Sequence, residues 1–291
     1  MSATILDGKA LAKTMRGELN TAVAQFKADH GFVPTIAVVR AGEEEASVRY
    51  SRTIEKAATN RGMDFALHTL PATASQRQIV ALVRRLNADQ GVHAIMIQEP
   101  MPKGIDEAAV KAELTPDKDV DGVHAVNAGR LGHAAPTGRP AMVGPFFVPA
   151  TPAGGLEILK RYEVALQGKH AVVVGRSNIV GKPMAMLLLR ENATVTMCHS
   201  RTTDLAAVCR SADVLCAAVG RAKMIQGNWI KPGAVVVDFG VNFVDGQMCG
   251  DVDFEQAAQV AAMITPVPGG TGPMTNVMLL RNVLEAAERQ A

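Results

Sequence analysis

The spacing of apolar residues in the first hundred positions predicts helices alternating with short buried strands. Between Leu11 and Phe26 apolar side chains recur every three or four residues, which is typical of an amphipathic helix, and Asp7 is placed to cap it. Buried strands are predicted at 35–39 and 92–97 and a further strand at 65–70, with helical patterns between them at 43–61 and 75–86. Strand, helix, strand, helix, strand predicts a parallel sheet.

A second alternation follows a passage rich in glycine and proline at 115–151. Apolar runs predict strands at 171–174, 194–198, 214–219 and 234–237, and helices at 183–189 and 205–210. A last helix at 277–288 is expected to pack back onto the first domain. The predicted fold is therefore α/β with two domains. The first comprises 1–148 and is completed by 277–291, and the second, Rossmann-like, domain comprises 149–276.

Composition narrows the class of protein. Of the 291 residues 48% are apolar and 20% charged, which excludes a disordered chain, and the net charge of +2 with 4% aromatic residues disfavours a nucleic-acid groove. The four cysteines show no zinc-site spacing, so we expect free thiols and no metal. The first residues do not resemble a signal peptide, and no apolar run could span a bilayer, so a cytoplasmic protein without a membrane partner is expected.

The segment 174–183 is the candidate nucleotide loop. It joins a predicted strand to a predicted helix, with Gly175 and Gly181 six residues apart and Pro183 in the first helical turn. Such a turn presents backbone N–H groups and a helix N-terminus to phosphate. Ser177 replaces the second glycine of the dinucleotide fingerprint, so a merely structural turn is the alternative.

The end of the next predicted strand favours NADP over NAD. NAD enzymes usually carry an acid there for the ribose diol, whereas this strand ends in His199, Ser200 and Arg201. Arg176 and Arg201 can both bind a 2′-phosphate, because a guanidinium presents several donors that match phosphate oxygens. The alternative interpretation is two solvated surface arginines.

Several motifs together resemble one family. They are Gly-Arg-Ser-x-x-Val-Gly-x-Pro at 175–183, Cys-His-Ser-Arg-Thr at 198–202, Lys-Asp-Val-Asp-Gly at 118–122, and the proline–glycine string at 264–275. Their order and spacing resemble methylenetetrahydrofolate dehydrogenase/methenyltetrahydrofolate cyclohydrolase over nearly the whole chain. The resemblance implies an N-terminal catalytic domain, an NADP-binding domain, a folate cleft between them and a homodimer.

The resemblance also implies roles for individual residues. Tyr50, in the Ser-x-x-Tyr motif that begins at Ser47, would stack on the aminobenzoyl ring of the folate, and Asp121 would hydrogen-bond the pterin. The other folate residues implied are Gln98, Pro268, Gly270 and Pro273. The cofactor residues implied are Gly175, Arg176, Ser177, Ile179, Val180, Gly181, Ser200, Arg201, Gly220, Gly240 and Thr275.

The chain departs from the family at one catalytic position. The family carries a lysine four residues after the tyrosine, on the same helical face, and here that position is Ile54. Lys56 is a poor substitute, because two further residues turn it about 200° round the helix. Glu99 is a second departure, since the family usually has an apolar residue there, and it leaves a related pterin or a non-folate substrate open.

The two family reactions make different demands on this position. Hydride transfer from the bridging methylene needs positioning but no general base. Hydrolysis of the methenyl group needs acid–base help, typically worth about 10²–10⁴-fold, which isoleucine cannot give. The sequence therefore predicts an NADP-dependent dehydrogenase of tetrahydrofolate derivatives with weak or absent cyclohydrolase activity. The alternatives are a bifunctional enzyme that uses Lys56 or another group, and a non-catalytic folate-binding paralogue.

Overall fold

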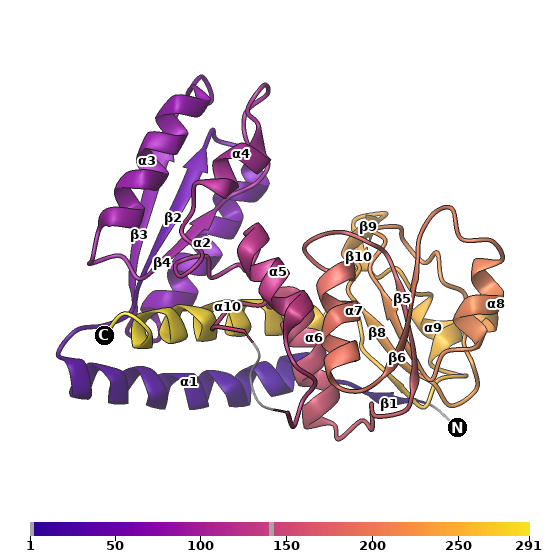
Figure 1. The fold of residues 1–291 in the computed structure, drawn as a ribbon. Coiled ribbons are helices and arrows are strands. Elements are labelled where there is room, and N and C mark those ends of the chain that lie inside the picture. The colour runs from indigo at the N-terminus through magenta and orange to yellow at the C-terminus, as the bar shows by residue number, and fades with distance from the viewer. Residues whose placement is uncertain (1–2, 140–142) are drawn as a thin grey trace. The chain divides into compact units, whose positions relative to one another are not determined.

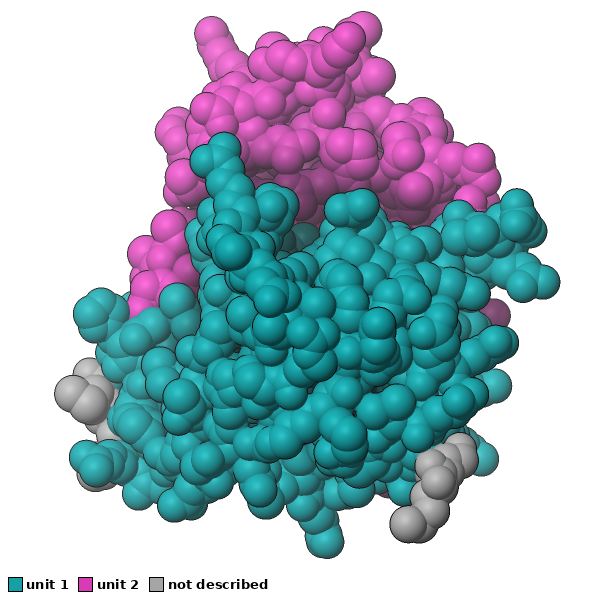
Figure 2. All heavy atoms as spheres, turned by 90° about the vertical axis from the view of Figure 1, so that its right-hand side faces the viewer, with its two compact units in different colours: residues 1–13, 130–144, 149–278 teal, residues 14–129, 145–148, 279–291 magenta. Residues whose placement is uncertain are grey.

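A computed structural model describes residues 3–139 and 143–291, so Met1, Ser2 and three residues of the predicted glycine- and proline-rich passage lie outside it. The chain forms two compact units, coloured separately in Figure 2. The folate unit, as we call it from its predicted residues, comprises 14–129, 145–148 and 279–291. The nucleotide unit comprises 1–13, 130–144 and 149–278.

The folate unit is built on a parallel sheet of three strands in the order β3-β2-β4 (Figure 1). The strands are β2 (Thr35–Ala41), β3 (Asp64–Leu70) and β4 (Ala94–Ile97). The helices are α2 (Glu45–Thr59), α3 (Gln76–Ala88) and α4 (Glu107–Ala112), together with parts of α1 (Gly8–His30), α5 (Ala125–His133) and α10 (Thr271–Glu288). The predicted strands and helices of this half are therefore confirmed, with shifts of a few residues at their ends.

Local signals explain these elements. The Asp7 side chain accepts a hydrogen bond from the Ala10 amide at 2.9 Å, which confirms the predicted start of α1. Ser75 and Gln78 form a reciprocal capping box before α3. The apolar stripe of α3 packs with α4 against one face of the sheet and buries a core of Ala37, Val39, Ile79, Leu82, Val83, Leu86, Ile95, Val110 and Leu114.

The nucleotide unit contains a parallel sheet of six strands in the order β1-β11-β8-β7-β5-β6. Its strands are β1 (Thr4–Ile5), β5 (His170–Val174), β6 (Thr194–Cys198), β7 (Val214–Ala217), β8 (Val235–Asp238) and β11 (Met263–Ile264). Its helices include α6 (Ala150–Arg161), α7 (Gly181–Arg190), α8 (Leu205–Arg210), η1 (Gly227–Trp229) and α9 (Phe254–Ala257). An antiparallel hairpin of β9 (Asn242–Val244) and β10 (Gln247–Cys249) follows β8.

The arrangement of β5, β6 and β7 fixes where a ligand can bind. β6 lies on one side of β5 and β7 on the other, so the switch point of the sheet lies between β5 and β7. Open α/β sheets bind ligands at the carboxyl ends of strands at such a switch point. The predicted α/β class with a Rossmann-like parallel sheet is confirmed, and the predicted nucleotide loop follows β5.

The compact units differ from the predicted domain boundaries at the N-terminus and around residue 137. Residues 1–13 group with the nucleotide unit because β1 pairs with β11, with the Thr4 amide donating to the Ala262 carbonyl at 2.8 Å. Residues 130–144 also group with the nucleotide unit, and the Thr137 amide joins them to α7 by donating to the Arg190 carbonyl at 2.8 Å. A strand of two residues has no periodicity that a sequence pattern could reveal.

Two further elements differ from the sequence prediction. The glycine- and proline-rich passage contains the helix α5, whose nine residues include two glycines that weaken the helical pattern. The last helix begins at Thr271 rather than at residue 277. Its second half belongs to the folate unit, as expected: the buried Asn282 amide donates to the carbonyls of Val120 at 2.7 Å and Val148 at 3.1 Å.

Candidate functional site

The nucleotide loop is shaped by two glycines that bring backbone segments into contact. Gly175 has φ +126°, and a Cβ on it would lie 2.1 Å from the Ala218 carbonyl oxygen after β7. A Cβ on Gly181 would lie 2.3 Å from the Gly175 carbonyl oxygen. Real side chains cannot occupy such space, so both positions require glycine. The loop therefore runs directly over the carboxyl ends of β5 and β7.

Ser177 holds the loop in place of the missing fingerprint glycine. Its Oγ accepts hydrogen bonds from the amides of Val180 at 3.1 Å and Gly181 at 3.3 Å. The Lys182 ammonium donates to the Asn178 side chain at 2.7 Å. The ten-residue helix α7 begins here without a side-chain cap, and its N-terminus carries the partial positive charge that favours phosphate.

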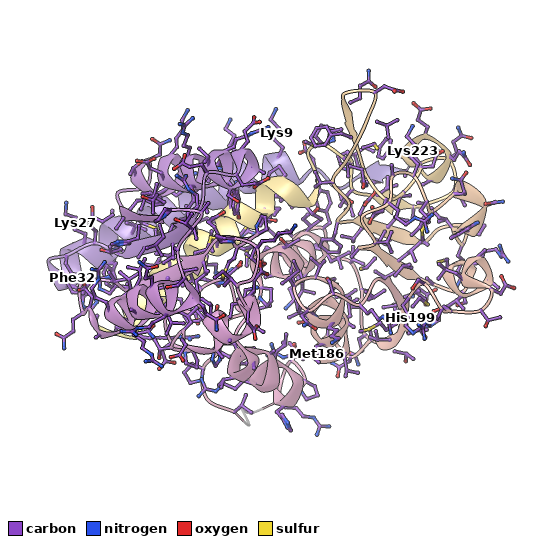
Figure 3. The ribbon with its side chains drawn as sticks, turned by 90° about the horizontal axis from the view of Figure 1, so that it is seen from above. Lys9, Lys27, Phe32, Met186, His199 and Lys223 are labelled. Carbon is purple, nitrogen blue, oxygen red and sulfur yellow. The ribbon has the colours of Figure 1, made fainter. Side chains whose placement is uncertain are left out.

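The predicted phosphate-binding arginines follow neighbouring strands. Val174 pairs with Cys198, and the Gly175 amide donates to the Cys198 carbonyl at 2.9 Å, so Arg176 and Arg201 follow strands that end together. Both arginines and Ser200 are exposed. The turn before Arg201 is ordered by His199, labelled in Figure 3, whose Nδ1 accepts from the Arg201 amide at 3.1 Å. No carboxylate follows β6 within this turn.

Two buried carboxylates that the sequence analysis missed support the rest of this site. Asp251 accepts hydrogen bonds from the amides of Val219 at 2.6 Å, Gly220 at 3.0 Å and Arg221 at 2.8 Å, and so shapes the loop after β7. Asp238 accepts from the Gly240 amide at 2.8 Å. Burial raises the pKa of Asp238 to about 6.

A sequence signal could have located these two acids. Asp238 ends the otherwise apolar strand β8, and Asp251 follows a glycine at the end of β10. An acid at such a position must find hydrogen-bond donors when it is buried. The predicted residues Gly220 and Gly240 thus lie in loops whose amides are bound by carboxylates.

The proline–glycine string completes the nucleotide unit. The Thr265 hydroxyl accepts from the Asp238 amide at 2.8 Å, and the Thr271 hydroxyl donates to the Asp238 carbonyl at 3.0 Å, which ties the string to the end of β8. Thr275 shares a hydrogen bond with Thr151 at 3.2 Å. Gly270 is buried, Pro273 half-buried and Pro268 exposed.

In the folate unit the structure brings Tyr50 and Asp121 together. Both are half-buried, and burial followed by the charge of Asp121 raises the pKa of the Tyr50 hydroxyl. Burial, with a contribution from the neighbouring Asp119 carboxylate, raises the pKa of Asp121 to about 6. Lys111 opposes that rise and Glu99 adds to it, so five ionisable groups interact here.

Ser47 and Gln98 border the same group of side chains. Gln98 is buried, and its amide N–H donates to the Val39 carbonyl at 2.9 Å, which fixes the end of β4 against β2. The Ser47 hydroxyl donates to the Glu99 carbonyl at 3.1 Å and so ties the start of α2 to the segment after β4. The folate residues predicted in this unit therefore gather around one end of the sheet, whereas Pro268, Gly270 and Pro273 belong to the nucleotide unit.

Position 54 is part of the apolar interior. Ile54 is 1% exposed and lies on the buried face of α2 with Ser47, Ser51 and Ala58. Lys56 is exposed. Ile54 and Lys56 thus lie on different faces of α2, as the 3.6-residue period of a helix requires. Sequence reasoning missed Lys111, which no family motif marked.

The described residues show neither a metal cluster nor a membrane span. Among them, no three His, Cys, Asp or Glu side chains converge in a way that could hold a metal ion. In the same residues, no helix combines the length and the apolar character needed to cross a bilayer.

Comparison with known proteins agrees with the resemblance found in the sequence. The chain is 53% identical over 291 residues to the "Bifunctional protein FolD" of Roseiflexus sp. (strain RS-1), covering 100% of this chain and 98% of that protein. It is 53% identical over 297 residues to "Bifunctional protein FolD 3" of Rhizorhabdus wittichii, covering 99% and 94% of the two chains.

Solved structures also match this chain over nearly its whole length. The bifunctional FolD methylenetetrahydrofolate dehydrogenase/cyclohydrolase of Campylobacter jejuni superposes with a TM-score of 0.94 at 38% identity and covers 100% of both chains. The Trypanosoma brucei enzyme, solved with NADP cofactor and an inhibitor, superposes with a TM-score of 0.91 at 37% identity and covers 99% of this chain and 98% of that one.

Two descriptions of one family match the two halves of the chain. Residues 6–121 match "Tetrahydrofolate dehydrogenase/cyclohydrolase, catalytic domain", and residues 149–291 match the "NAD(P)-binding domain" of the same family. The motifs, the parallel sheet with its glycine loop and the full-length relatives agree: this chain belongs to the tetrahydrofolate dehydrogenase/cyclohydrolase family.

Proposed function

We propose that this chain oxidises 5,10-methylenetetrahydrofolate with NADP and hydrolyses the methenyl product to 10-formyltetrahydrofolate. The observation that carries the proposal is the family match along the whole chain, including relatives that are called bifunctional. That match favours the bifunctional alternative over the loss of hydrolysis predicted from Ile54. The dehydrogenase without cyclohydrolase activity stays a second candidate, because a fully buried isoleucine cannot transfer a proton.

The nucleotide unit fits NADP by its own chemistry. Gly175 and Gly181 let the loop lie directly on the backbone at the ends of β5 and β7, and the N-terminus of α7 with Arg176 and Arg201 supplies positive charge. NADP bound there would supply the hydride acceptor. Ser177 would keep the loop in its binding conformation by holding the amides of Val180 and Gly181.

The folate unit would orient the substrate for hydride loss. The Asp121 carboxylate would accept hydrogen bonds from the pterin, and the Tyr50 ring would stack on the aminobenzoyl group. Gln98 is fixed by its backbone and would present its amide to the bridge region. The electrons of N5 expel the hydride, so the chain needs to position the folate and need not remove a proton.

The two activities can be measured separately in the unmodified protein. We expect formation of NADPH from methylenetetrahydrofolate and loss of methenyltetrahydrofolate absorbance above the rate in buffer. NADPH formation without accelerated hydrolysis would establish the dehydrogenase-only candidate, and Ile54→Lys should then restore part of the hydrolysis. No NADPH formation would favour a non-catalytic paralogue or another pterin substrate.

Arg176 should determine the preference for NADP. Arg176→Ala removes a charge-assisted hydrogen bond to the 2′-phosphate, which is worth about 1–3 kcal/mol, so the Kd for NADP should rise about 5- to 150-fold. The Kd for NAD should stay within about twofold, since NAD has no phosphate at this position. Fluorescence titration with both nucleotides checks this, with the exposed Arg210→Ala as control. A preference of the wild type for NAD would contradict the proposal.

Asp121 should make folate binding depend on pH. Its pKa is raised to about 6, so the carboxylate is mostly ionised at pH 7 and loses its charge as the pH falls through 6. A protonated acid accepts hydrogen bonds poorly. The affinity for tetrahydrofolate should therefore decrease as the pH drops below 6, and the decrease should approach about tenfold per pH unit. Calorimetric titrations from pH 5 to 8 under anaerobic conditions measure this affinity at each pH.

The matched variants separate Asp121 from other acids. Asp121→Asn should bind tetrahydrofolate more weakly at pH 7 and show no such step, whereas the exposed Asp117→Asn should keep it. A pH step that persists in Asp121→Asn would assign it to another group.

We further propose a homodimer that forms through the β9–β10 hairpin. Phe243 is 66% exposed and Val241 58% exposed, and Val244 and Met248 add to this apolar surface. An exposed apolar surface of this kind is typical of a protein contact. Sedimentation equilibrium should give twice the chain mass of 30.7 kDa, and Phe243→Glu should shift it toward the monomer. A Phe243→Glu variant that stays dimeric would exclude this hairpin, and Gln247→Glu is the matched control.

A further inference from the structure

An ion pair lies beside the candidate folate residues that neither the motifs nor the family match assigns. The Lys111 ammonium on α4 pairs with the Glu99 carboxylate in the segment after β4. The Lys111 side chain is 19% exposed and that of Glu99 39%. Glu107, one helical turn before Lys111, accepts from the Met101 amide at 2.8 Å and holds the same segment to α4. The pair is thus partly shielded from water, and the hydrogen bond from Met101 to Glu107 holds its two segments together.

The position of the pair relates it to the folate residues. Glu99 directly follows Gln98, and its carbonyl accepts a hydrogen bond from the Ser47 hydroxyl at 3.1 Å. Both charges act on Asp121, Glu99 raising and Lys111 lowering the pKa of that carboxyl. Glu99 and Lys111 therefore belong to the same electrostatic group as Tyr50 and Asp121.

Lys111 gives this group of side chains an amine, whereas position 54 on α2 is an isoleucine. Ile54 is buried on α2 and Lys56 is exposed, so α2 brings no amine to the site from either position. We propose that the Glu99–Lys111 ion pair supplies the acid–base groups for hydrolysis of the methenyl bridge. This inference rests on the proposed bifunctional activity.

The chemistry balances with one carboxylate and one ammonium. The Glu99 carboxylate takes a proton from water as the water oxygen bonds to the methenyl carbon, and the C=N electrons move onto nitrogen. The Lys111 ammonium then protonates N5 as the C–N5 bond breaks, and the neutral amine takes the proton of the hydroxyl group that becomes the formyl oxygen. Glu99 finally releases its proton, so one water is consumed and one proton is released.

The test compares hydrolysis with dehydrogenation in the same preparation. Lys111→Gln and Glu99→Gln should each lower the ratio of the hydrolysis rate to the dehydrogenase rate by about 10²-fold or more, the size expected for lost acid–base catalysis. Lys111→Arg keeps the positive charge and the ion pair but donates a proton poorly, because the arginine guanidinium stays protonated in proteins. The ratio should therefore fall at least tenfold in this variant too.

Controls separate this role from a structural one. The exposed Lys103→Gln in the same segment should keep the wild-type ratio, and thermal unfolding with NADP titration shows whether each variant is folded. If Lys111 only anchors α4, Lys111→Arg retains hydrolysis, which would overturn the inference. Wild-type hydrolysis that persists in both Lys111 variants overturns it and leaves the proposed function intact. A wild type that lacks hydrolysis overturns both.

Discussion

Close approach between backbone segments is the constraint on which the nucleotide unit depends. The carbonyl of Ala218, the turn at Gly175 and the first turn of α7 meet where no side chain fits. Because of this contact, the loop after β5 passes directly over β7, at the switch point of the sheet. Ser177 then holds the amides of the loop from within. A larger residue at either glycine would displace the loop from the strand ends.

Buried carboxylates extend this arrangement to the neighbouring loops. Asp251 binds three consecutive amides after β7, and Asp238 binds amides after β8 while its own backbone is held by Thr265 and Thr271. Burial of a charge costs free energy unless hydrogen bonds compensate it, and here backbone amides do so. The loops that carry Gly220, Gly240 and the proline–glycine string are thereby connected through two side chains.

The folate unit uses charge differently. Burial is the main reason that the pKa of Asp121 lies near 6, and the neighbouring Asp119 and Glu99 carboxylates add to the rise. Lys111 balances part of this negative charge through its ion pair with Glu99. In our proposal this lysine, which comes from α4, supplies the amine that α2 does not bring to the site.

The sequence by itself determined the α/β class, the order of most strands and helices, the glycine loop and the family. These features have local signals: apolar periodicity, caps such as Asp7 and Ser75, and motifs of fixed spacing. Only the tertiary structure decided that β1 joins β11, that Asp251 binds the loop after β7, and that Lys111 meets Glu99. Each of these joins residues distant in the chain, 32 positions for Asp251 and Val219. Short strands and single ionisable side chains leave no periodic signal, so their partners follow from packing alone.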